Sequence, residues 1–366
     1  MRILFLSHTY WGSPYRIGSH HLSAQMAMAG HEVFYVSTPM SLLHFLKYPA
    51  TNIRRSQAGH VHAVRERLHQ WIPLTMLPAG EIFLSGFDAS ALGLSRQLQE
   101  VRSVCGADDF DVVFIDEPRL AGFLRFFPAR CIVYRPTDIY AAMGIRRWRK
   151  LESHILQKAN CLVCTSGPLL DFLRTNFQVG CPARVQVNGV DYEHFLTPRP
   201  CPDEYRGEPG QKCLYVGALD FRFDFDAFSK MAAAAPDVCF YIIGGGEEKE
   251  IERLRGIKNV RFLGFRSYDD VPAYMQHADV AILPARPGES NDGRSPMKIY
   301  EYLACGLPVL AFGTQELQRR SLPGVFFYAE HDEIGSALRH ALSKDRQSYV
   351  DQKLHWRNIA EAMLED

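Results

Sequence analysis

The chain has 366 residues, which is enough for two domains with cores of their own. Lys plus Arg and Asp plus Glu both number 41, so the charge balance gives no sign of a nucleic-acid partner. The 9 cysteines follow no framework spacing, and we expect them to be reduced in the cytoplasm. Cys161 and Cys164 have the spacing of a metal or redox pair, but they lie in a predicted strand, where residues three apart point to opposite faces.

No segment predicts a membrane span. The apolar run at 3–6 ends at Ser7, so it is much shorter than the apolar region of a signal peptide. No stretch approaches the roughly 20 apolar residues that a helix needs to cross a bilayer. We therefore expect a soluble protein or one that binds a membrane surface.

The first half of the chain predicts a parallel sheet. Strands at 2–6 and 32–37 flank a helix at 20–28, which makes a βαβ unit. Four more strands are predicted at 111–115, 131–134, 161–165 and 184–187. Polar residues follow each of them, and ligands of open parallel sheets bind beyond the carboxyl ends of the strands. We therefore expect the site residues of this half at those ends.

Basic and aromatic residues recur beside apolar runs in the first half. The segment 40–85 is irregular in pattern, and its apolar runs lie beside Lys47 and Arg65. Residues 126–130 and 146–150 continue the mixture. Such segments suit an anionic membrane surface, but they equally suit core helices with solvated basic ends. Both interpretations stay open at this point.

A segment rich in Pro and Gly, residues 196–210, predicts a linker. A second α/β series follows it. Its strands are predicted at 213–216, 238–243, 260–262, 280–283 and 309–312. Helices at about 334–343 and 348–364 end the chain.

The stretch 295–312 combines a capped helix, a turn and a strand. Ser295 suits an N-cap, and Pro296 suits the first helical position. Lys298 and Glu301 are three residues apart and share one face of this helix. The free N–H groups of the helix start, together with Lys298, suit a diphosphate, and Glu301 suits the hydroxyls of a ribose. The alternative is an ordinary amphipathic helix with a solvated Lys/Glu pair.

Several segments of the second half resemble the GT-B glycosyltransferases. In order, they are Val-Gly-Ala-Leu-Asp at 216–220, Ile-Gly-Gly-Gly-Glu at 243–247, Phe-Leu-Gly-Phe at 262–265 and Lys-Ile-Tyr-Glu-Tyr-Leu-Ala-Cys-Gly-Leu-Pro-Val at 298–309. The first half is covered more loosely. Its Tyr-Arg-x-x-Asp segment at 134–138, with the Ser-x-Met-Lys start of the helix, is similar to the bacterial exopolysaccharide glucuronosyltransferase family of xanthan assembly.

The resemblance implies an α/β fold of two Rossmann-like domains with a C-terminal helix that crosses back to the N-terminal domain. Residues 1–195, with the C-terminal helix at 346–366, would bind the acceptor. Residues 196–210 would be the linker, and residues 211–345 would bind a nucleotide-sugar.

The resemblance also implies residue roles. Eight positions are assigned to the donor: Gly217, Gly244, Gly245, Phe265, Ser295, Met297, Lys298 and Glu301. The glycines would permit close approach of the backbone, although a plain strand-to-helix turn explains each of them too. Four positions are assigned to the acceptor: Gly12, His20, His21 and Arg135.

One departure from the family pattern bears on the mechanism. Many retaining GT-B enzymes have a second glutamate eight positions before the one at 301, but this chain has Gly293 there. An inverting reaction then needs a base for the acceptor hydroxyl. Asp138 matches the catalytic aspartate of the resembled family, and an Asp that only caps the next helix is the alternative. Asp116 and Glu117 are the other candidates.

The function that this implies is transfer of a sugar, with glucuronate as one candidate, from a UDP-sugar to a lipid-linked or polysaccharide acceptor. A retaining transferase, a nucleotide-sugar epimerase and a non-catalytic member that docks at a membrane are the alternatives. No metal and no cofactor are expected, and the spacing of Gly12 and Gly18 does not match the dinucleotide fingerprint. We expect a cytoplasmic protein with a peripheral contact at the inner face of the plasma membrane.

Overall fold

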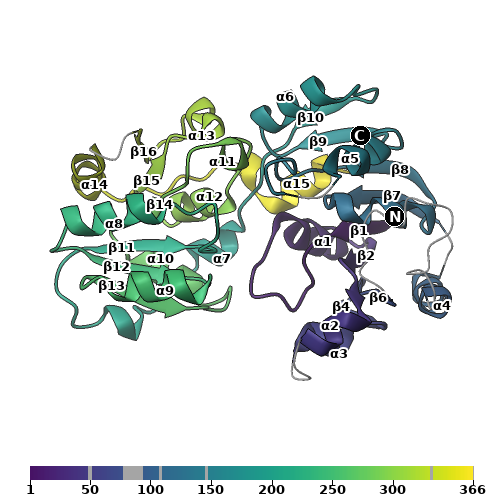
Figure 1. Ribbon diagram of the computed structural model, residues 1–366, viewed down its shortest axis with the longest axis horizontal. Helices are drawn as coiled ribbons and strands as arrows, with labels where there is room; N and C mark the ends of the chain where they lie inside the picture. Colours follow the sequence, from purple (N-terminus) through teal and green to yellow (C-terminus); the bar gives the residue numbers. More distant parts are fainter. Residues whose placement is uncertain (48–51, 77–93, 107–108, 145–146, 330–332, 366) are drawn as a thin grey trace. The chain divides into compact units, whose positions relative to one another are not determined.

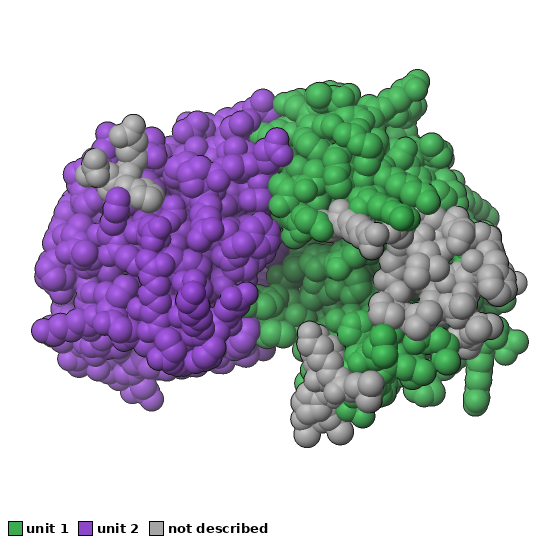
Figure 2. Space-filling view, viewed as in Figure 1, with its two compact units in different colours: residues 1–187, 359–366 green, residues 188–358 purple. Residues whose placement is uncertain are grey.

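The computed structural model describes residues 1–47, 52–76, 94–106, 109–144, 147–329 and 333–365 (Figure 1). Part of the segment 40–85, for which a membrane surface and core helices were both open interpretations, lies outside the described residues, as does residue 146. The chain forms two compact units (Figure 2). Unit 1 comprises Met1–Val187 and Ile359–Asp366, and unit 2 comprises Asn188–Asn358.

Unit 1 is built on an 8-stranded sheet with the order β10-β9-β8-β7-β1-β2-β5-β4. Its strands are β1 (Arg2–Ser7), β2 (Glu32–Ser37), β4 (Val61–Arg65), β5 (Leu68–Trp71), β7 (Phe110–Ile115), β8 (Ala129–Tyr134), β9 (Cys161–Cys164) and β10 (Ala183–Val185). All neighbours pair in parallel except β4 and β5, which are antiparallel. A small second sheet pairs β3 (Met40–Ser41) with β6 (Leu74–Thr75).

The helices of unit 1 connect these strands as in a doubly wound fold. They are α1 (Gly18–Met28), α2 (Leu42–Lys47), α3 (Ile53–Gln57), α4 (Leu94–Cys105), η3 (Pro118–Arg125), α5 (Trp148–Leu156) and α6 (Gly167–Asn176). The segment 40–85, whose pattern was irregular, contributes β4 and β5 to the edge of the main sheet. The βαβ unit predicted from residues 2–37 is confirmed, because β1 and β2 pair in parallel from Arg2 to Ser7.

Unit 2 is built on a 6-stranded parallel sheet with the order β13-β12-β11-β14-β15-β16. Its strands are β11 (Lys212–Val216), β12 (Cys239–Ile243), β13 (Val260–Gly264), β14 (Val280–Leu283), β15 (Val309–Phe312) and β16 (Val325–Tyr328). Its helices are α7 (Tyr192–Leu196), η4 (Asp203–Tyr205), α8 (Phe225–Ala234), α9 (Glu248–Arg255), α10 (Val271–His277), α11 (Glu289–Asp292), α12 (Met297–Ala304), α13 (Gln315–Arg320), α14 (Ile334–Leu342) and η6 (Gln352–Leu354).

The core of unit 2 lies between its sheet and the helices α8, α9 and α14. Phe228 and Met231 of α8 and Leu338 of α14 are fully buried there, against Phe240 and Ile242 of β12. Each strand places alternate side chains in this cluster, which is the period-2 pattern of a sheet covered by helices. The fold therefore leaves the ends of the strands, rather than their faces, to bind ligands.

The segment 196–210, predicted as a linker, lies within unit 2 and packs against the rest of that unit. Tyr205 is buried, and its ring lies 4.4 Å from that of Tyr241. Glu204 Oε1 accepts hydrogen bonds from Arg266 Nη2 at 2.8 Å and from the Tyr274 hydroxyl at 3.0 Å. The boundary between the compact units falls earlier in the chain, between residues 187 and 188.

The last helix, α15 (Trp356–Ala362), belongs to both units, because the boundary falls within it at Ile359. In unit 1, Arg184 Nη2 donates a hydrogen bond to the Ala362 carbonyl at 3.1 Å. The expected return of the C-terminal helix to the N-terminal domain is thus confirmed, but the predicted bounds 346–366 are wrong, because residues 346–351 are not helical. Within the described part of the chain, none of the helices combines the length and hydrophobicity that a membrane span needs.

Candidate active site

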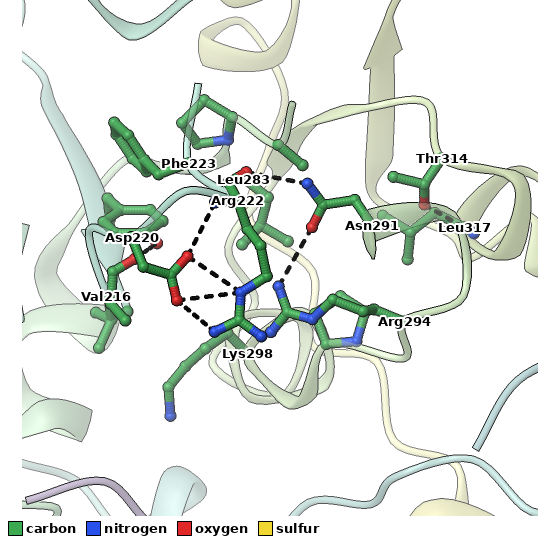
Figure 3. Close-up of a pocket in the computed structure, with 16 residues that line it drawn as sticks. Val216, Asp220, Arg222, Phe223, Leu283, Asn291, Arg294, Lys298, Thr314 and Leu317 are labelled. Atoms are coloured by element: carbon green, nitrogen blue, oxygen red, sulfur yellow. Dashed lines mark hydrogen bonds and ion pairs between the residues drawn. The ribbon is translucent and has the colours of Figure 1, made fainter. Parts of the chain in front are cut away.

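A pocket opens at the carboxyl ends of β11 and β14 in unit 2 (Figure 3). Its walls come from the loop after β11, the loop after β14 and the first turn of α12. Parallel strands place their carboxyl ends at one edge of the sheet, and this edge is where open α/β sheets bind ligands. The polar residues that line the pocket are Asp220, Arg222, Asn291, Arg294, Lys298 and Thr314.

Arg222 is held in the pocket by Asp220. Its Nε donates to both carboxylate oxygens of Asp220 at 3.1 Å, and its Nη2 donates to Oδ2. Burial raises the pKa of Asp220, but the hydrogen bonds and charge of Arg222 outweigh it, so that pKa lies below its usual value. The pair is therefore ionised at neutral pH, and the guanidinium keeps a fixed orientation.

Asn291 joins the two loops that form the pocket wall. Its side chain is buried, and Nδ2 donates to the carbonyls of Arg222 at 3.0 Å and Arg286 at 2.9 Å. Its Oδ1 accepts from Arg294 Nη1 at 3.4 Å. Figure 3 shows Arg222 between Asp220 and Asn291. One amide thus fixes the backbone at Arg222 and the side chain of Arg294.

Lys298 and Glu301 form an ion pair on α12, with Lys298 Nζ 2.5 Å from Glu301 Oε2. The side chain of Glu301 is only 3% exposed, whereas that of Lys298 is 25% exposed and lines the pocket. The prediction that these residues share one face is confirmed, and the alternative of a fully solvated pair is excluded for Glu301. The helix docks on β11 through Tyr302, whose hydroxyl accepts from the Val216 N–H at 2.7 Å.

The predicted cap of this helix is wrong. The helix begins at Met297, and Pro296 is its N-cap, without a capping side chain. Pro296 has extended backbone angles, so it ends the loop and does not begin the helix. Ser295 is buried, and its hydroxyl lies 3.1 Å from that of Tyr300, while its carbonyl accepts from Asn188 at 2.7 Å. No side chain therefore accepts a capping hydrogen bond from the first N–H groups of this helix.

The predicted donor glycines lie together at the ends of β11 and β12. The Gly217 N–H donates to the Ile243 carbonyl at 2.9 Å. A Cβ at Gly244, whose φ is +144°, would lie 1.8 Å from the Gly217 carbonyl oxygen. A Cβ at Gly245 would lie 2.4 Å from Phe265 Cζ. The contact with the Gly217 carbonyl thus requires glycine at 244, whether or not a ligand binds, whereas the exposed Phe265 ring could move away from a Cβ at 245. The Phe265 ring lies over Gly245, and Phe265 itself is 52% exposed.

The other predicted site residues belong to unit 1, at the carboxyl edge of its own sheet. Asp138 follows β8, is half-buried, and accepts from the Thr137 hydroxyl at 3.0 Å. Glu117, an alternative base, accepts from Arg119 Nε and Nη2 at 2.8 Å each and caps η3. These bonds give Glu117 a structural role. Asp116 is buried.

The candidate acceptor residues of unit 1 differ in exposure. Gly12 is exposed in the loop between β1 and α1, whereas His20, His21 and Arg135 are buried. Burial, with the nearby charges of Arg16 and His8, lowers the pKa of His20 to about 3. His20 is therefore neutral at physiological pH. Burial lowers the pKa of Arg135 to about 10, so its guanidinium remains charged.

Sequence reasoning missed Arg222, Asn291 and Arg294. Arg222 comes two residues after the Val-Gly-Ala-Leu-Asp segment that carried the resemblance, and Arg294 comes directly before Ser295. Their positions beside recognised motifs were the available signal. No local spacing shows that the loops after β11 and β14 face one pocket.

Two family models match the chain. Residues 210–344 match the family described as Glycosyl transferases group 1, and residues 5–165 match the N-terminal domain of the glucuronosyltransferase GumK. Both matched models describe glycosyltransferases, and together they span most of the chain. These matches cover the sheet of unit 2 and most of the sheet of unit 1.

The sequence relatives share less than a third of their aligned residues with this chain. A putative teichuronic acid biosynthesis glycosyltransferase, TuaH of Bacillus subtilis, is 29% identical over 219 residues, which is 55% of this chain and 55% of TuaH. The chain thus spans about half the length of that relative. The glycogen synthase of Mycobacterium tuberculosis is 24% identical over 318 residues, which is 78% of this chain and 72% of the synthase.

Solved structures of glycosyltransferases share the fold of this chain. Sucrose-phosphate synthase from Thermosynechococcus elongatus has a TM-score of 0.71 at 17% identity and covers 100% of this chain and 98% of its own. Anabaena Alr3699/HepE in complex with UDP has a TM-score of 0.63 at 16% identity and covers 99% of this chain and 94% of its own. The expected fold class is confirmed.

We predict that Gly244→Ala destabilises unit 2. The new Cβ would meet the Gly217 carbonyl in a backbone conformation that only glycine adopts readily, so we expect a loss of roughly 2–4 kcal/mol of unfolding free energy. Gly256→Ala is the control, because its φ is −69° and the nearest atom to its Cβ is 3.5 Å away. Urea denaturation measures the unfolding free energy of both variants. Equal values for Gly244→Ala and Gly256→Ala would contradict the requirement for glycine at 244.

Proposed function

We propose that the chain transfers a sugar from a UDP-sugar to a lipid-linked or polysaccharide acceptor. One observation carries this proposal: Arg222, Arg294 and Lys298 line a single pocket at the carboxyl edge of the sheet in unit 2, beside the amino end of α12. A diphosphate is the part of a nucleotide-sugar that such a cluster would bind. The UDP complex of Alr3699/HepE, which shares the fold, supports the choice of nucleotide.

The cations would act in two ways. In the ground state they would hold the two phosphates of the donor. As the bond from the anomeric carbon to the diphosphate oxygen breaks, negative charge grows on that oxygen. Fixed positive charges stabilise this developing charge without reorganisation, which is the larger contribution to the rate. We propose that no metal takes part, because these side chains supply the positive charge that the leaving group needs.

The rest of the donor would follow the same edge. Glu301, whose Oε2 is bound by Lys298, would accept from the ribose hydroxyls. Gly217, Gly244 and Gly245 would let the backbone approach the nucleotide, and Phe265 would lie by the base. Ser295 and Met297 would contact the donor around the start of α12. These roles come from the family resemblance, and the pocket at Lys298 and Gly217 supports them.

We propose an inverting reaction with Asp138 as its base. The carboxylate takes the proton of the acceptor hydroxyl while the oxygen attacks the anomeric carbon, and the diphosphate leaves with the electron pair of the broken bond. Gly293 stands where a retaining enzyme of this fold has its second glutamate, and a glycine offers no carboxylate. A retaining transferase and an epimerase of the same fold remain the alternatives.

Glucuronate is the sugar that we propose. The matched N-terminal model is named for a glucuronosyltransferase, and TuaH is named for teichuronic acid biosynthesis. An exopolysaccharide or a lipid-linked precursor of one would be the acceptor. We propose a cytoplasmic protein with a peripheral contact at the inner face of the plasma membrane. Arg149 and Lys150, which are exposed on α5 beside Trp148, would contribute to that contact.

The diphosphate assignment predicts a loss of nucleotide affinity when the charge of Lys298 is removed. Lys298→Met should weaken UDP binding roughly 10- to 100-fold, which is the value of one charge-assisted hydrogen bond. Arg222→Met should have a similar effect, since its guanidinium lines the same pocket. Lys249→Met, on the exposed face of α9, is the matched control. Calorimetry measures all four affinities, and wild-type binding by both pocket variants would exclude the site.

The base assignment predicts that Asp138→Asn removes turnover of UDP-glucuronate while leaving UDP affinity unchanged. The amide keeps the shape of the carboxyl group but cannot take a proton at neutral pH. Release of UDP and the anomeric configuration of the product are measured by NMR. Turnover retained by Asp138→Asn would refute its role as base, and retention of configuration would favour the alternative mechanism.

A further inference from the structure

The carboxyl edge of unit 1 contains a second group of polar residues around Asp116. Asp116 follows β7, and its side chain lies on the same face of the sheet as Ser7 of β1. The rings of Phe5 and Phe114, two residues earlier in each strand, stack at 4.9 Å and show that the faces match. Asp116 is 3% exposed, so its carboxylate is surrounded by protein.

The two carboxylate oxygens of Asp116 differ in their contacts. Oδ2 accepts hydrogen bonds from the hydroxyls of Ser7, at 2.8 Å, and Ser19. Oδ1 is buried and accepts no hydrogen bond from any residue that the structure describes. The Nδ1 atom of His8 lies 4.0 Å from it. A small rotation of the imidazole would therefore bring Nδ1–H within hydrogen-bond distance of the remaining acceptor.

Burial is the largest influence on Asp116 and leaves the pKa of its carboxyl group above the usual value, although neighbouring groups offset part of the effect. Burial raises the pKa of the carboxyl group, while His8, the two serines and the guanidinium of Arg135 lower it. Arg135 is itself buried and stays charged. The Tyr140 hydroxyl donates to the main-chain carbonyl of Asp116 and fixes the backbone there.

His8 occupies the position between this buried carboxylate and solvent. Its side chain is 37% exposed, and its carbonyl accepts from the Thr38 hydroxyl at 3.0 Å, which fixes the backbone. When Nδ1 carries the proton and faces Asp116, Nε2 is the unprotonated nitrogen and faces outward as an acceptor. A buried carboxylate that orients an exposed imidazole is a known way to set its tautomer.

We propose that His8, oriented by Asp116, accepts a hydrogen bond from a hydroxyl of the acceptor sugar. This inference rests on the proposed function. In the sheet, β1 and β8 are separated by β7 alone, so their ends lie roughly 10 Å apart at the usual strand spacing. A sugar above this edge would reach both His8, after β1, and Asp138, after β8. His8 thus determines acceptor specificity, and Asp116 is a positioning residue.

The first experiment measures the tautomer of His8 by imidazole 15N chemical shifts in the full chain. We expect Nδ1 protonated and Nε2 unprotonated in the wild type, and a loss of this preference in Asp116→Asn. A wild-type His8 protonated at Nε2, or a tautomer that Asp116→Asn leaves unchanged, would overturn the proposal. This measurement needs no substrate, so it tests whether Asp116 orients His8 even if the chain turns over no UDP-sugar.

The second experiment compares sugar transfer to a panel of octyl glycosides with hydrolysis of the same UDP-glucuronate by water. His8→Ala should lower kcat/KM for transfer roughly tenfold, the value of one hydrogen bond, without changing hydrolysis or UDP affinity. His8→Gln, whose amide oxygen can accept, should restore part of the loss. His60→Ala is the control, since its side chain is 72% exposed and pairs with Glu100.

The outcomes separate this inference from the proposed function. Transfer by His8→Ala at the wild-type rate, or hydrolysis reduced in parallel with transfer, would contradict a role in acceptor binding. Absence of both transfer and hydrolysis in the wild type would count against the proposed function. If the wild type hydrolyses the donor but uses none of the glycosides, the tautomer of His8 decides the proposal.

Discussion

The loops after β11 and β14 and the first turn of α12 hold Arg222, Arg294 and Lys298 around one pocket, where three positive charges repel one another. Asp220 and Glu301 each bind one of these cations, and the buried amide of Asn291 ties the loop backbones together. The arrangement is stable without a ligand because two carboxylates accompany the three cations. It still leaves an excess of positive charge for a diphosphate. The packing of the strand ends and the docking of α12 through Tyr302 serve to keep these groups at one edge of the sheet.

Much of the fold could be predicted from the sequence, because its signals are local. The buried strands of both sheets are short apolar runs that end in polar residues, and the pairing of β1 with β2 followed from one βαβ unit. The helix with Lys298 and Glu301 was found from a spacing of three residues, and the structure places both side chains on one face. The strands β4 and β5 were missed, since the alternation of β4 (Val-His-Ala-Val-Arg) breaks at Val64 and β5 (Leu-His-Gln-Trp) has only two apolar residues.

The parts of the site that escaped prediction depend on tertiary contacts. Arg222 and Arg294 lie 72 residues apart, and their loops are brought together by the pairing of β11 with β14, by the bridge between Phe223 and Ala285, and by Asn291. The sequence offered Glu117 and Asp116 as equivalent candidates for the base. In the structure, Glu117 instead binds Arg119 and caps the start of η3. The expected N-cap at Ser295 failed for a similar reason, because its hydroxyl contacts Tyr300 and its carbonyl is bound by Asn188. The capping and helix propensities of single residues do not predict these tertiary partners.

The central claim is that the pocket of unit 2 binds the diphosphate of a nucleotide, and calorimetric titration with UDP and with uridine tests it most directly. The account predicts that UDP binds and that its affinity falls as salt is added, because the contacts are ionic. Uridine, which has no phosphate, should bind far more weakly. Equal affinities for UDP and uridine, or no binding of UDP at low salt, would contradict the account.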